Sequence, residues 1–474
     1  MREGFKRTTK FIIAFLLALT LAVPPFLGSP EAVSAEEQDS LTLNLDGMTV
    51  EEVQSDEQLS PLLDDPLFNR YYITDEEGVI HSMEVIDEEE TAAQEGITLK
   101  GASLASATHP DKYSSKNGYG AIRCIDVSNW QGVISVSSWK KVRKAGIRRV
   151  ILRCGFTYQK DKFTKEEDAA FEKNIKNAWK AGMLIGVYYY SQATTIKEAK
   201  KEANYTLDII RPYKNKITLP VCYDFEWGGR LNKKYAEKKG KEYMTDICEA
   251  YCDIIKDAGY TPMIYASYSV FTNNLYRKRL TKQYKIWLAH YTSKGKATDY
   301  PGAFYVWQYT SSGKVNGLDG RIDMNYIYEY GRFIKQDNGD YKYKENKKYQ
   351  SSVWLKRAGA TYYISKKGIR ITDRYVKISG YHYGFDKSGI LYRGVKATIN
   401  DKERTFLYCG KAVIAVKVTK CKVNGRTKAS HNSKVKKTYP KDTKIRITRV
   451  STSGNWSRNA SGYWMWSNYL KDYE

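Results

Sequence analysis

The sequence predicts an α/β fold, with a barrel of alternating strands and helices in the middle of the chain and β-structure after it. Between residues 118 and 334, short apolar runs alternate with amphipathic stretches, which is the pattern of a mostly parallel sheet covered by helices. From residue 350 onwards, turn residues recur at a fixed interval. The chain has 474 residues, which is too long for one ordinary core and indicates about three domains.

Residues 1–35 have the features of a secretory signal peptide. Four basic residues lie among the first ten, an apolar run follows at 11–23, and small residues stand at 33–35. We expect cleavage after Ala35 and no stable membrane insertion afterwards. The alternative is an uncleaved anchor, which is less favoured because the apolar run is shorter than about 18 residues. Export argues against nucleic acid as a partner.

Residues 36–117 are expected to be an acidic segment and a linker. Residues 36–100 contain nineteen acids and two bases, while the whole chain has a net charge of +24, so the remainder is strongly basic. The acidic part is either a solvated spacer or a pro-segment that masks the basic body. Within it we expect one hairpin around Glu77–Gly78, and the composition of residues 101–120 predicts a linker.

Eight strands are expected between residues 118 and 334, enough to close a TIM-like (β/α) barrel. The predicted strands are Ile122–Val127, Arg149–Cys154, Leu184–Tyr190, Leu219–Phe225, Pro262–Ala266, Ile286–His290, Phe304–Tyr309 and Ile322–Asn325. The predicted helices are Ser138–Ala145, Glu166–Ala181, Ile196–Ile210, Lys234–Ala258 and Tyr268–Leu275. In such barrels the reactive side chains gather at the C-terminal ends of the strands.

Acidic side chains fall at these strand ends. Asp126 ends the first strand, Asp224 and Glu226 end the fourth, and Asp323 lies on the last. Asp224 and Glu226 are two positions apart, so strand geometry places them on one face. An acid pair hydrolyses glycosidic bonds when one member is protonated and the other ionised. The alternative is a solvated acidic rim.

Aromatic and amide side chains at the same strand ends are candidates for binding sugar rings, because the C–H groups of a sugar pack on aromatic faces. These candidates are Tyr188, Tyr190, Trp227, Trp307 and Gln308. His290 is expected to be a structural, hydrogen-bonded histidine. Seven cysteines do not indicate a disulfide framework in a chain of this length, and we expect Cys124 and Cys222 to be buried thiols.

Four motifs occur in this region in order: Ile125–Gly132, Tyr223–Glu226, Trp307–Tyr309 and Ile322–Asn325. They resemble the motifs of glycoside hydrolase family 25, the secreted lysozymes (N-acetylmuramidases) of bacteria and phages. The resemblance covers residues 118–334. It implies a peptidoglycan hydrolase that cleaves the β-1,4 bond between N-acetylmuramic acid and N-acetylglucosamine, and it implies no metal or cofactor.

The resemblance also implies roles for the acids. Glu226 would be the general acid that protonates the leaving oxygen and then the base that activates water, while Asp224 would either attack the anomeric carbon or orient the substrate's N-acetyl group. Asp126 and Asp323 would tune the pair, and we expect Glu226 to hold a proton and Asp224 to be ionised. The chain departs from the family at Trp227–Arg230, where we expect a reshaped rim.

The C-terminal third is expected to bind the cell wall. Residues 335–348 read as a linker, and Gly368, Gly389 and Gly410 then mark hairpin units at a constant spacing. Residues 350–412 resemble cell-wall-binding repeats of the choline-binding type without their recurrent tryptophans, and residues 413–474 resemble a bacterial SH3-like domain through their closing motif. The alternatives are a spacer of hairpins and a basic domain without a specific ligand.

Together these observations predict a secreted, wall-associated enzyme of cell-wall remodelling or autolysis. Its partners would be bacterial peptidoglycan and the associated anionic wall polymers, and we expect a monomer. The alternative is a catalytically inactive wall-binding protein on the same barrel. The presence of Asp126, Asp224, Glu226 and Asp323 argues against that alternative.

Overall fold

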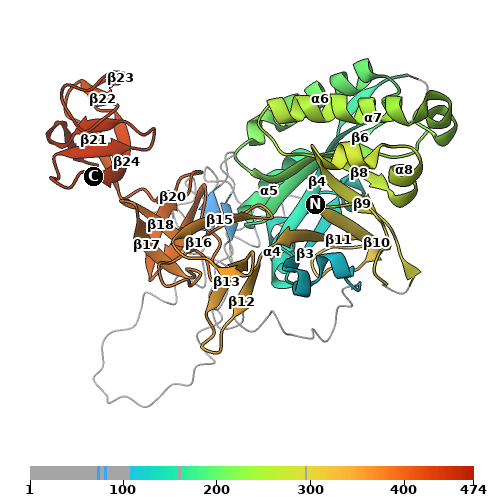
Figure 1. Cartoon of the computed structure of the whole chain (residues 1–474). Coiled ribbons are helices and arrows are strands. Elements are labelled where there is room, and N and C mark those ends of the chain that lie inside the picture. The colour runs from blue at the N-terminus through green and yellow to red at the C-terminus, as the bar shows by residue number, and fades with distance from the viewer. Residues whose placement is uncertain (1–71, 75–79, 83–106, 159–161, 294–295, 474) are drawn as a thin grey trace, which may run out of the picture. The chain divides into compact units, whose positions relative to one another are not determined.

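The computed structural model describes residues 72–74, 80–82, 107–158, 162–293 and 296–473 (Figure 1). The predicted signal peptide and most of the acidic segment therefore lie outside the described residues. In the first of two compact units, residues 1–90, β1 (Tyr72–Thr74) pairs antiparallel with β2 (Ile80–Ser82). This pairing is where the hairpin was expected. The second unit spans residues 91–474 and contains the barrel.

The barrel is a closed sheet of eight strands, and each predicted strand is present. The strands are β3 (Tyr119–Val127), β4 (Arg149–Thr157), β6 (Leu184–Ser191), β7 (Ile217–Phe225), β8 (Pro262–Ser267), β9 (Lys285–Ala289), β10 (Val306–Gly313) and β11 (Ile322–Tyr330). Pairing between β3 and β4 closes the sheet, and the short β5 (Lys165–Glu167) adds to the side of β4. The prediction of an eight-stranded barrel is confirmed.

The last barrel strand runs in the opposite direction to the others. β11 is antiparallel to both of its neighbours, β10 and β3, whereas the other neighbouring barrel strands are parallel. As a result the start of β11 lies at the same rim as the ends of the parallel strands. Asp323, near the start of β11, is the direct register partner of Asp126 near the end of β3.

Helices connect most of the strands and pack on the outside of the barrel (Figure 1). They are α4 (Val136–Lys144), α5 (Phe171–Lys180), α6 (Ile196–Ile210), α7 (Lys233–Asp257), α8 (Tyr268–Asn273) and α9 (Arg277–Thr281). Ser135, Thr195 and Asn232 cap their helices with side-chain oxygens, the usual role of these residues. The helix expected from Glu166 was wrong at its start, because residues 165–167 form β5.

The segment before the barrel is not the linker that its composition predicted. Among its described residues, Tyr113 is buried and its hydroxyl accepts a hydrogen bond of 2.8 Å from the backbone N–H of Phe304. The His109 ring lies 3.0 Å from the Tyr328 hydroxyl. Small and basic residues dominate the composition here, but the two aromatic side chains attach the segment to the barrel.

Residues 335–348 are also not a linker. β12 (Arg332–Lys335), β13 (Tyr341–Glu345) and β14 (Lys348–Tyr349) form a three-stranded antiparallel sheet. Tyr341 and Tyr343 alternate with lysines in β13, and Tyr343 is the residue of this strand that is buried. Residues two apart on a strand share a face, so the two tyrosines lie on the same side of the sheet.

Three two-stranded hairpins follow, beginning at residues 353, 374 and 395. They pair β15 (Val353–Arg357) with β16 (Ala360–Ile364), β17 (Arg374–Ile378) with β18 (Tyr381–Phe385), and β19 (Val395–Ile399) with β20 (Lys402–Phe406). Each hairpin turn has two residues at positive φ, at 358–359, 379–380 and 400–401, as type I′ turns require. Of the glycines that marked the predicted units, Gly368 and Gly389 lie between hairpins and Gly410 lies after the third, so none is inside a hairpin.

The first hairpin packs against the N-terminal rim of the barrel. Its turn residue Ala358 is buried with residues from the interior of the barrel, and its carbonyl accepts a hydrogen bond of 3.2 Å from Arg149 Nε. Ala360 and Tyr362 pack on Leu184, the first residue of β6. The hairpin therefore covers the end of the barrel opposite to the acidic rim.

The chain ends in a seven-stranded antiparallel sheet with a core of its own. Its strands are β21 (Ala415–Thr419), β22 (Val423–Arg426), β23 (Val435–Tyr439), β24 (Lys444–Val450), β25 (Trp456–Asn459), β26 (Trp464–Trp466) and β27 (Leu470–Asp472). Val423, Ile445 and Met465 are among its buried residues. Cys124 and Cys222 are buried free thiols, as predicted. Among the described helices none is long and apolar enough to cross a membrane.

Candidate active site

A cleft of about 690 Å³ opens at the rim where the parallel barrel strands end. It is lined by Ser128, Asn129, Trp130, Gln131, Arg153, Phe156, Thr157, Tyr158, Tyr188, Tyr190, Asp224, Glu226, Ser311, Arg321 and Asp323. The structure thus brings three of the four predicted acids and two of the predicted aromatic residues to one surface. Such a mixture of carboxyl groups and aromatic faces fits a polar ring substrate.

The fourth acid, Asp126, lies buried behind this surface. Its Oδ2 atom accepts hydrogen bonds from Asn325 Nδ2 at 2.7 Å and from Gln308 Nε2 at 3.0 Å. Burial and the neighbouring charge of Asp323 raise the pKa of Asp126 well above its ordinary value, although the two amides oppose the rise. The carboxyl of Asp126 is also hydrogen-bonded to the carboxyl of Asp323. Burial raises the pKa of Asp323 to about 6.

Gln308 reaches the site indirectly. Its side-chain oxygen accepts hydrogen bonds from the hydroxyls of Tyr265 (2.9 Å) and Tyr291 (2.7 Å), so that its amide group must point its N–H toward Asp126. Gln308 is buried and is not one of the residues that line the cleft in the described part of the chain. In this structure it orients Asp126, whereas the sequence predicted a contact with sugar.

Trp227 and Trp307, which were predicted to bind sugar, are not among the residues that line the cleft in the described part of the chain. Trp307 is fully buried, and its Nε1 donates a hydrogen bond of 2.9 Å to the carbonyl of His290. Trp227 is half-buried and packs edge-on against Phe225. Strand alternation explains Trp307, because it points to the helix-covered side while its neighbour Gln308 points inward. The His290 ring is hydrogen-bonded to Thr298 at 2.7 Å, as a structural histidine would be.

Asp224 and Glu226 both have carboxyl groups that favour the protonated form. Burial raises the pKa of Glu226 to about 7, and the nearby charge of Asp323 adds to the rise. Burial and the charge of Glu226 also raise the pKa of Asp224 well above its ordinary value. The Asp224 Oδ1 atom has no hydrogen-bond partner among the described residues. Burial and the charge of Glu226 thus oppose the expected ionisation of Asp224, and neither effect was visible in the sequence.

The part of the chain that contains most of this site resembles known proteins. Residues 125–318 match the model of the glycosyl hydrolases family 25. This match covers less than half of the chain. The chain is similar to the uncharacterized protein YegX of Escherichia coli, with 28% identity over 208 residues that cover 43% of this chain and 68% of YegX. Lysozyme M1 of Streptomyces globisporus is 25% identical over 212 residues, which cover 43% of this chain and 67% of that protein.

A solved structure, the bacterial lysozyme from Streptomyces coelicolor, is 23% identical to this chain, with a TM-score of 0.37. The alignment covers 44% of this chain and 92% of that lysozyme. The family match and the likeness to lysozyme M1 identify the barrel as a glycoside hydrolase of the lysozyme type. The match ends at residue 318, so the hairpins and the C-terminal sheet lie outside it.

The barrel places a cation in the cleft that was not predicted from the sequence. Arg153, on β4, donates from Nε to Asp168 Oδ2 at 2.7 Å and from Nη2 to Asn129. Asp168 is buried and also accepts from the backbone N–H of Asn129, so the guanidinium is held in place. Its charge opposes the rise in the pKa of Asp224. Its position near the end of a predicted strand was the signal that could have found it.

Trp130 is the second residue that was missed. It belongs to the 3₁₀ turn Asn129–Gln131 after β3, which Ser128 and Gln131 close as a capping box. Its side chain is 86% exposed although it lines the cleft. An exposed tryptophan on a rigid turn is a ready surface for a sugar ring. Within the described residues, no three His, Cys, Asp or Glu side chains are grouped so that they could hold a metal ion.

Proposed function

We propose that this chain is a secreted peptidoglycan hydrolase that cleaves the β-1,4 bond between N-acetylmuramic acid and N-acetylglucosamine. The observation that carries the proposal is the position and the pKa of Glu226. Its carboxyl lies on the wall of an open cleft, and burial raises its pKa to about 7. A group with this pKa holds a proton for a leaving oxygen at neutral pH and can take one back from water. Two proteins to which the chain is similar, lysozyme M1 and the lysozyme of Streptomyces coelicolor, are named as lysozymes.

In the proposed mechanism Glu226 protonates the glycosidic oxygen and later removes a proton from the attacking water. Asp224, from the same strand end, either attacks the anomeric carbon or orients the substrate's N-acetyl group to do so, and both routes retain the anomeric configuration. When substrate fills the cleft, the positive charge that develops on the sugar favours ionised Asp224. Arg153 and the hydrogen-bonded Asp126–Asp323 pair set the charge around it.

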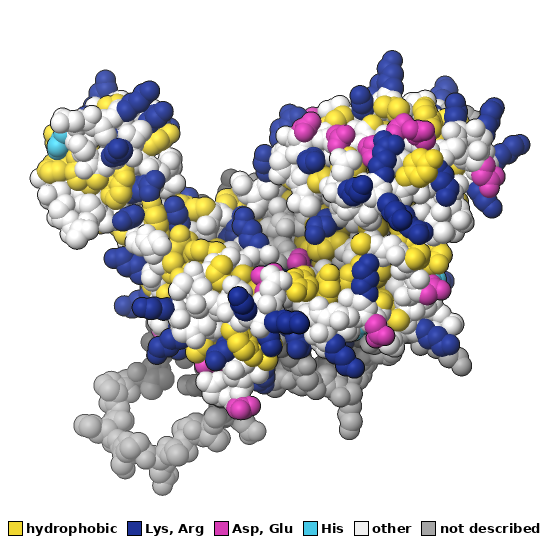
Figure 2. All heavy atoms as spheres, viewed as in Figure 1, with side chains coloured by type: hydrophobic (Ala, Val, Ile, Leu, Met, Phe, Trp, Pro, Cys, Tyr) yellow, Lys and Arg dark blue, Asp and Glu magenta, His cyan; other side chains and the backbone are white. Residues whose placement is uncertain are grey.

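The segments after the barrel are proposed to hold the enzyme on the wall. Residues 350–412 would act as cell-wall-binding repeats and residues 413–474 as an SH3-like domain, with residues 118–334 as the catalytic barrel. Figure 2 shows lysine and arginine side chains spread over the visible face of the second unit, with fewer acidic ones. A positive surface is attracted to anionic wall polymers. The predicted signal peptide supports secretion, and we propose that the secreted protein is a wall-associated monomer.

The variant Glu226→Gln tests the proposal. The amide cannot donate a proton to the leaving oxygen, so we expect wall lysis to fall by roughly 100-fold or more, while sedimentation with purified sacculi is unchanged. The matched control is Glu237→Gln on the exposed surface of α7, which should lyse walls at the parent rate. Lysis by Glu226→Gln at the parent rate would contradict the catalytic assignment.

Mass analysis of the products from a defined glycan tests the bond. Reducing ends of N-acetylmuramic acid support the proposal, and reducing ends of N-acetylglucosamine would show cleavage of the other bond. The alternative function, an inactive wall-binding protein, predicts that the parent chain binds sacculi and releases neither product.

A further inference from the structure

The carboxyl proposed to transfer the proton does not lie on a strand. β7 ends at Phe225, and Glu226 is the first residue of the loop that reaches α7 at Lys233. The position of Glu226 therefore depends on what holds this loop. The loop contains the stretch Trp227–Arg230, where the chain departs from the pattern of the family it resembles.

One buried side chain joins the two ends of the loop. Gln192, which follows β6, is fully buried. Its Nε2 donates to the carbonyl of Glu226 at 3.3 Å, and its Oε1 accepts from the backbone N–H of Leu231 at 3.2 Å. A single amide thus fixes the backbone of Glu226 to that of a residue five positions later.

Gly228 shows how closely the loop lies on this amide. A Cβ atom at Gly228 would lie 2.5 Å from Gln192 Oε1 and 2.6 Å from Gln192 Cδ and Nε2. The backbone conformation of Gly228 is one that other residues adopt, so the glycine is required by space and not by φ. Its N–H donates to the carbonyl of Leu231 at 2.7 Å, which closes the turn.

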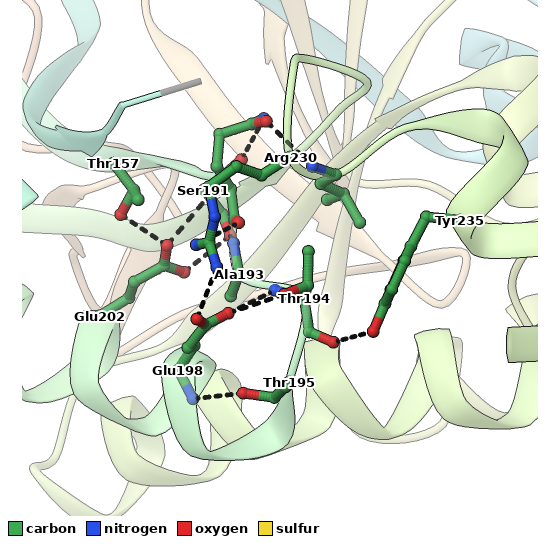
Figure 3. A network of polar contacts seen from close by, with 11 residues as sticks. Thr157, Ser191, Ala193, Thr194, Thr195, Glu198, Glu202, Arg230 and Tyr235 are labelled. Carbon is green, nitrogen blue, oxygen red and sulfur yellow. Dashed lines mark hydrogen bonds and ion pairs between the residues drawn. The ribbon is translucent and has the colours of Figure 1, made fainter. Parts of the chain in front are cut away.

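An ion pair holds the outer side of the same loop (Figure 3). Arg230 donates from Nη2 to Glu198 Oε1 at 2.7 Å and from Nη1 to the carbonyl of Gln192 at 3.2 Å. The Arg230 and Glu198 side chains are 14% and 18% exposed, so solvent screens the pair little. Glu198 also accepts from the backbone N–H of Thr194 at 2.8 Å.

The backbone of Gln192 is in turn hydrogen-bonded to a buried carboxyl. Glu202 on α6 is fully buried and accepts hydrogen bonds from Thr157 (2.6 Å), Ser191 (2.7 Å) and Tyr223 (3.2 Å). It also accepts from the backbone N–H of Gln192 at 3.2 Å. The loop that carries Glu226 is therefore tied through Gln192 to strands β4, β6 and β7 and to α6.

We infer that Gln192 is the positioning residue of Glu226, with Arg230 and Glu198 closing the outer side of the loop. The inference rests on the proposed function. Gln192 does not touch the substrate; it holds the backbone of Glu226 so that the carboxyl faces the scissile bond. A misplacement of about 1 Å is enough to cost roughly 100-fold in rate.

The effect of losing this contact differs from a general loss of structure. When the loop moves, water reaches Glu226 and the carboxyl loses part of the burial that raises its pKa. The basic limb of the kcat/KM profile, which reports the proton on Glu226, then moves to lower pH. Sugar binding by the opposite wall of the cleft is unchanged, so kcat falls while KM stays near the parent value.

Gln192→Met tests the inference, because methionine fills a similar volume without hydrogen bonds. We expect kcat on a soluble glycan to fall roughly 10- to 100-fold, KM to stay within about twofold, and the basic limb to move to lower pH. Gln283→Ala, on the exposed surface before β9, is the matched control and should match the parent. Folding of each variant is checked by circular dichroism and thermal melting.

A double-variant cycle separates positioning from packing. Gly228→Ala alone should lower kcat and melting temperature, because its Cβ meets the Gln192 amide. On a Gln192→Ala background the space is free, so Gly228→Ala should cost no further stability and kcat should stay low. If Gln192→Met folds and has the parent's kcat and pH profile, this inference is overturned while the proposed function stands. A parent chain that cleaves no glycan would overturn the proposed function, and this inference with it.

Discussion

Two tryptophans near the cleft show how exposure decides what a side chain can do. Trp130 is 86% exposed and Trp307 is fully buried, although both lie in motifs next to site residues. Trp130 stands on a capped 3₁₀ turn, so its ring projects from the cleft wall without being covered. Trp307 contributes to the hydrophobic core and hydrogen-bonds to the backbone after β9.

Alanine at each position should separate the two roles. Trp130→Ala removes a stacking surface and should raise KM roughly 3- to 10-fold, while the free energy of unfolding stays within about 0.5 kcal/mol of the parent. Trp307→Ala opens a cavity in the core and should cost about 3–5 kcal/mol. Kinetics on a soluble glycan and urea unfolding are the measurements. A destabilised Trp130→Ala with unchanged KM would show that Trp130 serves the fold.

Helix α6 buries a carboxyl, that of Glu202, which the proposed chemistry does not use. Burial raises the pKa of Glu202 to about 7, although hydrogen bonds from Ser191 and Thr157 oppose the rise. The folded protein therefore binds this proton more tightly than the unfolded chain does. Its stabilising contribution is complete below the ordinary value of 4.5 and is lost as the pH rises through about 7.

Glu202→Gln should remove this pH dependence, since an amide does not titrate. Between pH 5 and pH 8 the parent should lose about 2 kcal/mol more stability than the variant. Urea unfolding at both pH values measures the difference, and Glu242→Gln, an exposed position on α7, is the control. If the parent and Glu202→Gln lose equal stability over this range, Glu202 is not the titrating group.

Elements with strong periodicity could be predicted from the sequence, and those defined by tertiary contacts could not. The eight barrel strands are apolar runs buried on both faces, and α6 lies at Ile196–Ile210 as expected. The reversed direction of β11 has no signal in its own residues, because pairing partners decide it. Residues 335–348 were wrongly predicted to be a linker because lysine is the commonest residue of this run, while the buried residue of β13 is Tyr343.

The site shows the same division. Strand ends located Asp126, Asp224, Glu226 and Asp323, because parallel strands bring their ends to one rim. Neighbours from other strands decide which of these carboxyls faces the cleft. They also decide which one is hydrogen-bonded and which one is shielded from water. Gln308 is an example, since its orientation is set by two tyrosines from different parts of the chain.

At the scale of the whole second unit, the barrel is completed by residues beyond its own last strand. Ala358 packs with Leu219 and Trp287 in the barrel interior, and its backbone N–H donates to Glu329 at 2.9 Å. Arg148 forms an ion pair of 2.8 Å with Asp386, which directly follows the second hairpin. The first hairpin is therefore part of the structure of the barrel, in addition to any role on the wall.

Two truncations should distinguish these contributions. Removing residues 413–474 should weaken sedimentation with purified sacculi but leave melting temperature and turnover of small fragments unchanged, because the last sheet has its own core. Removing residues 335–474 uncovers the base of the barrel and should lower the melting temperature by at least about 5 °C. Ala358→Asp in the full chain should reproduce much of this loss by burying a charge, since aspartate tolerates positive φ. If the chain that ends at residue 334 has the same melting temperature as the full chain, the first hairpin does not stabilise the barrel and its role is limited to wall binding.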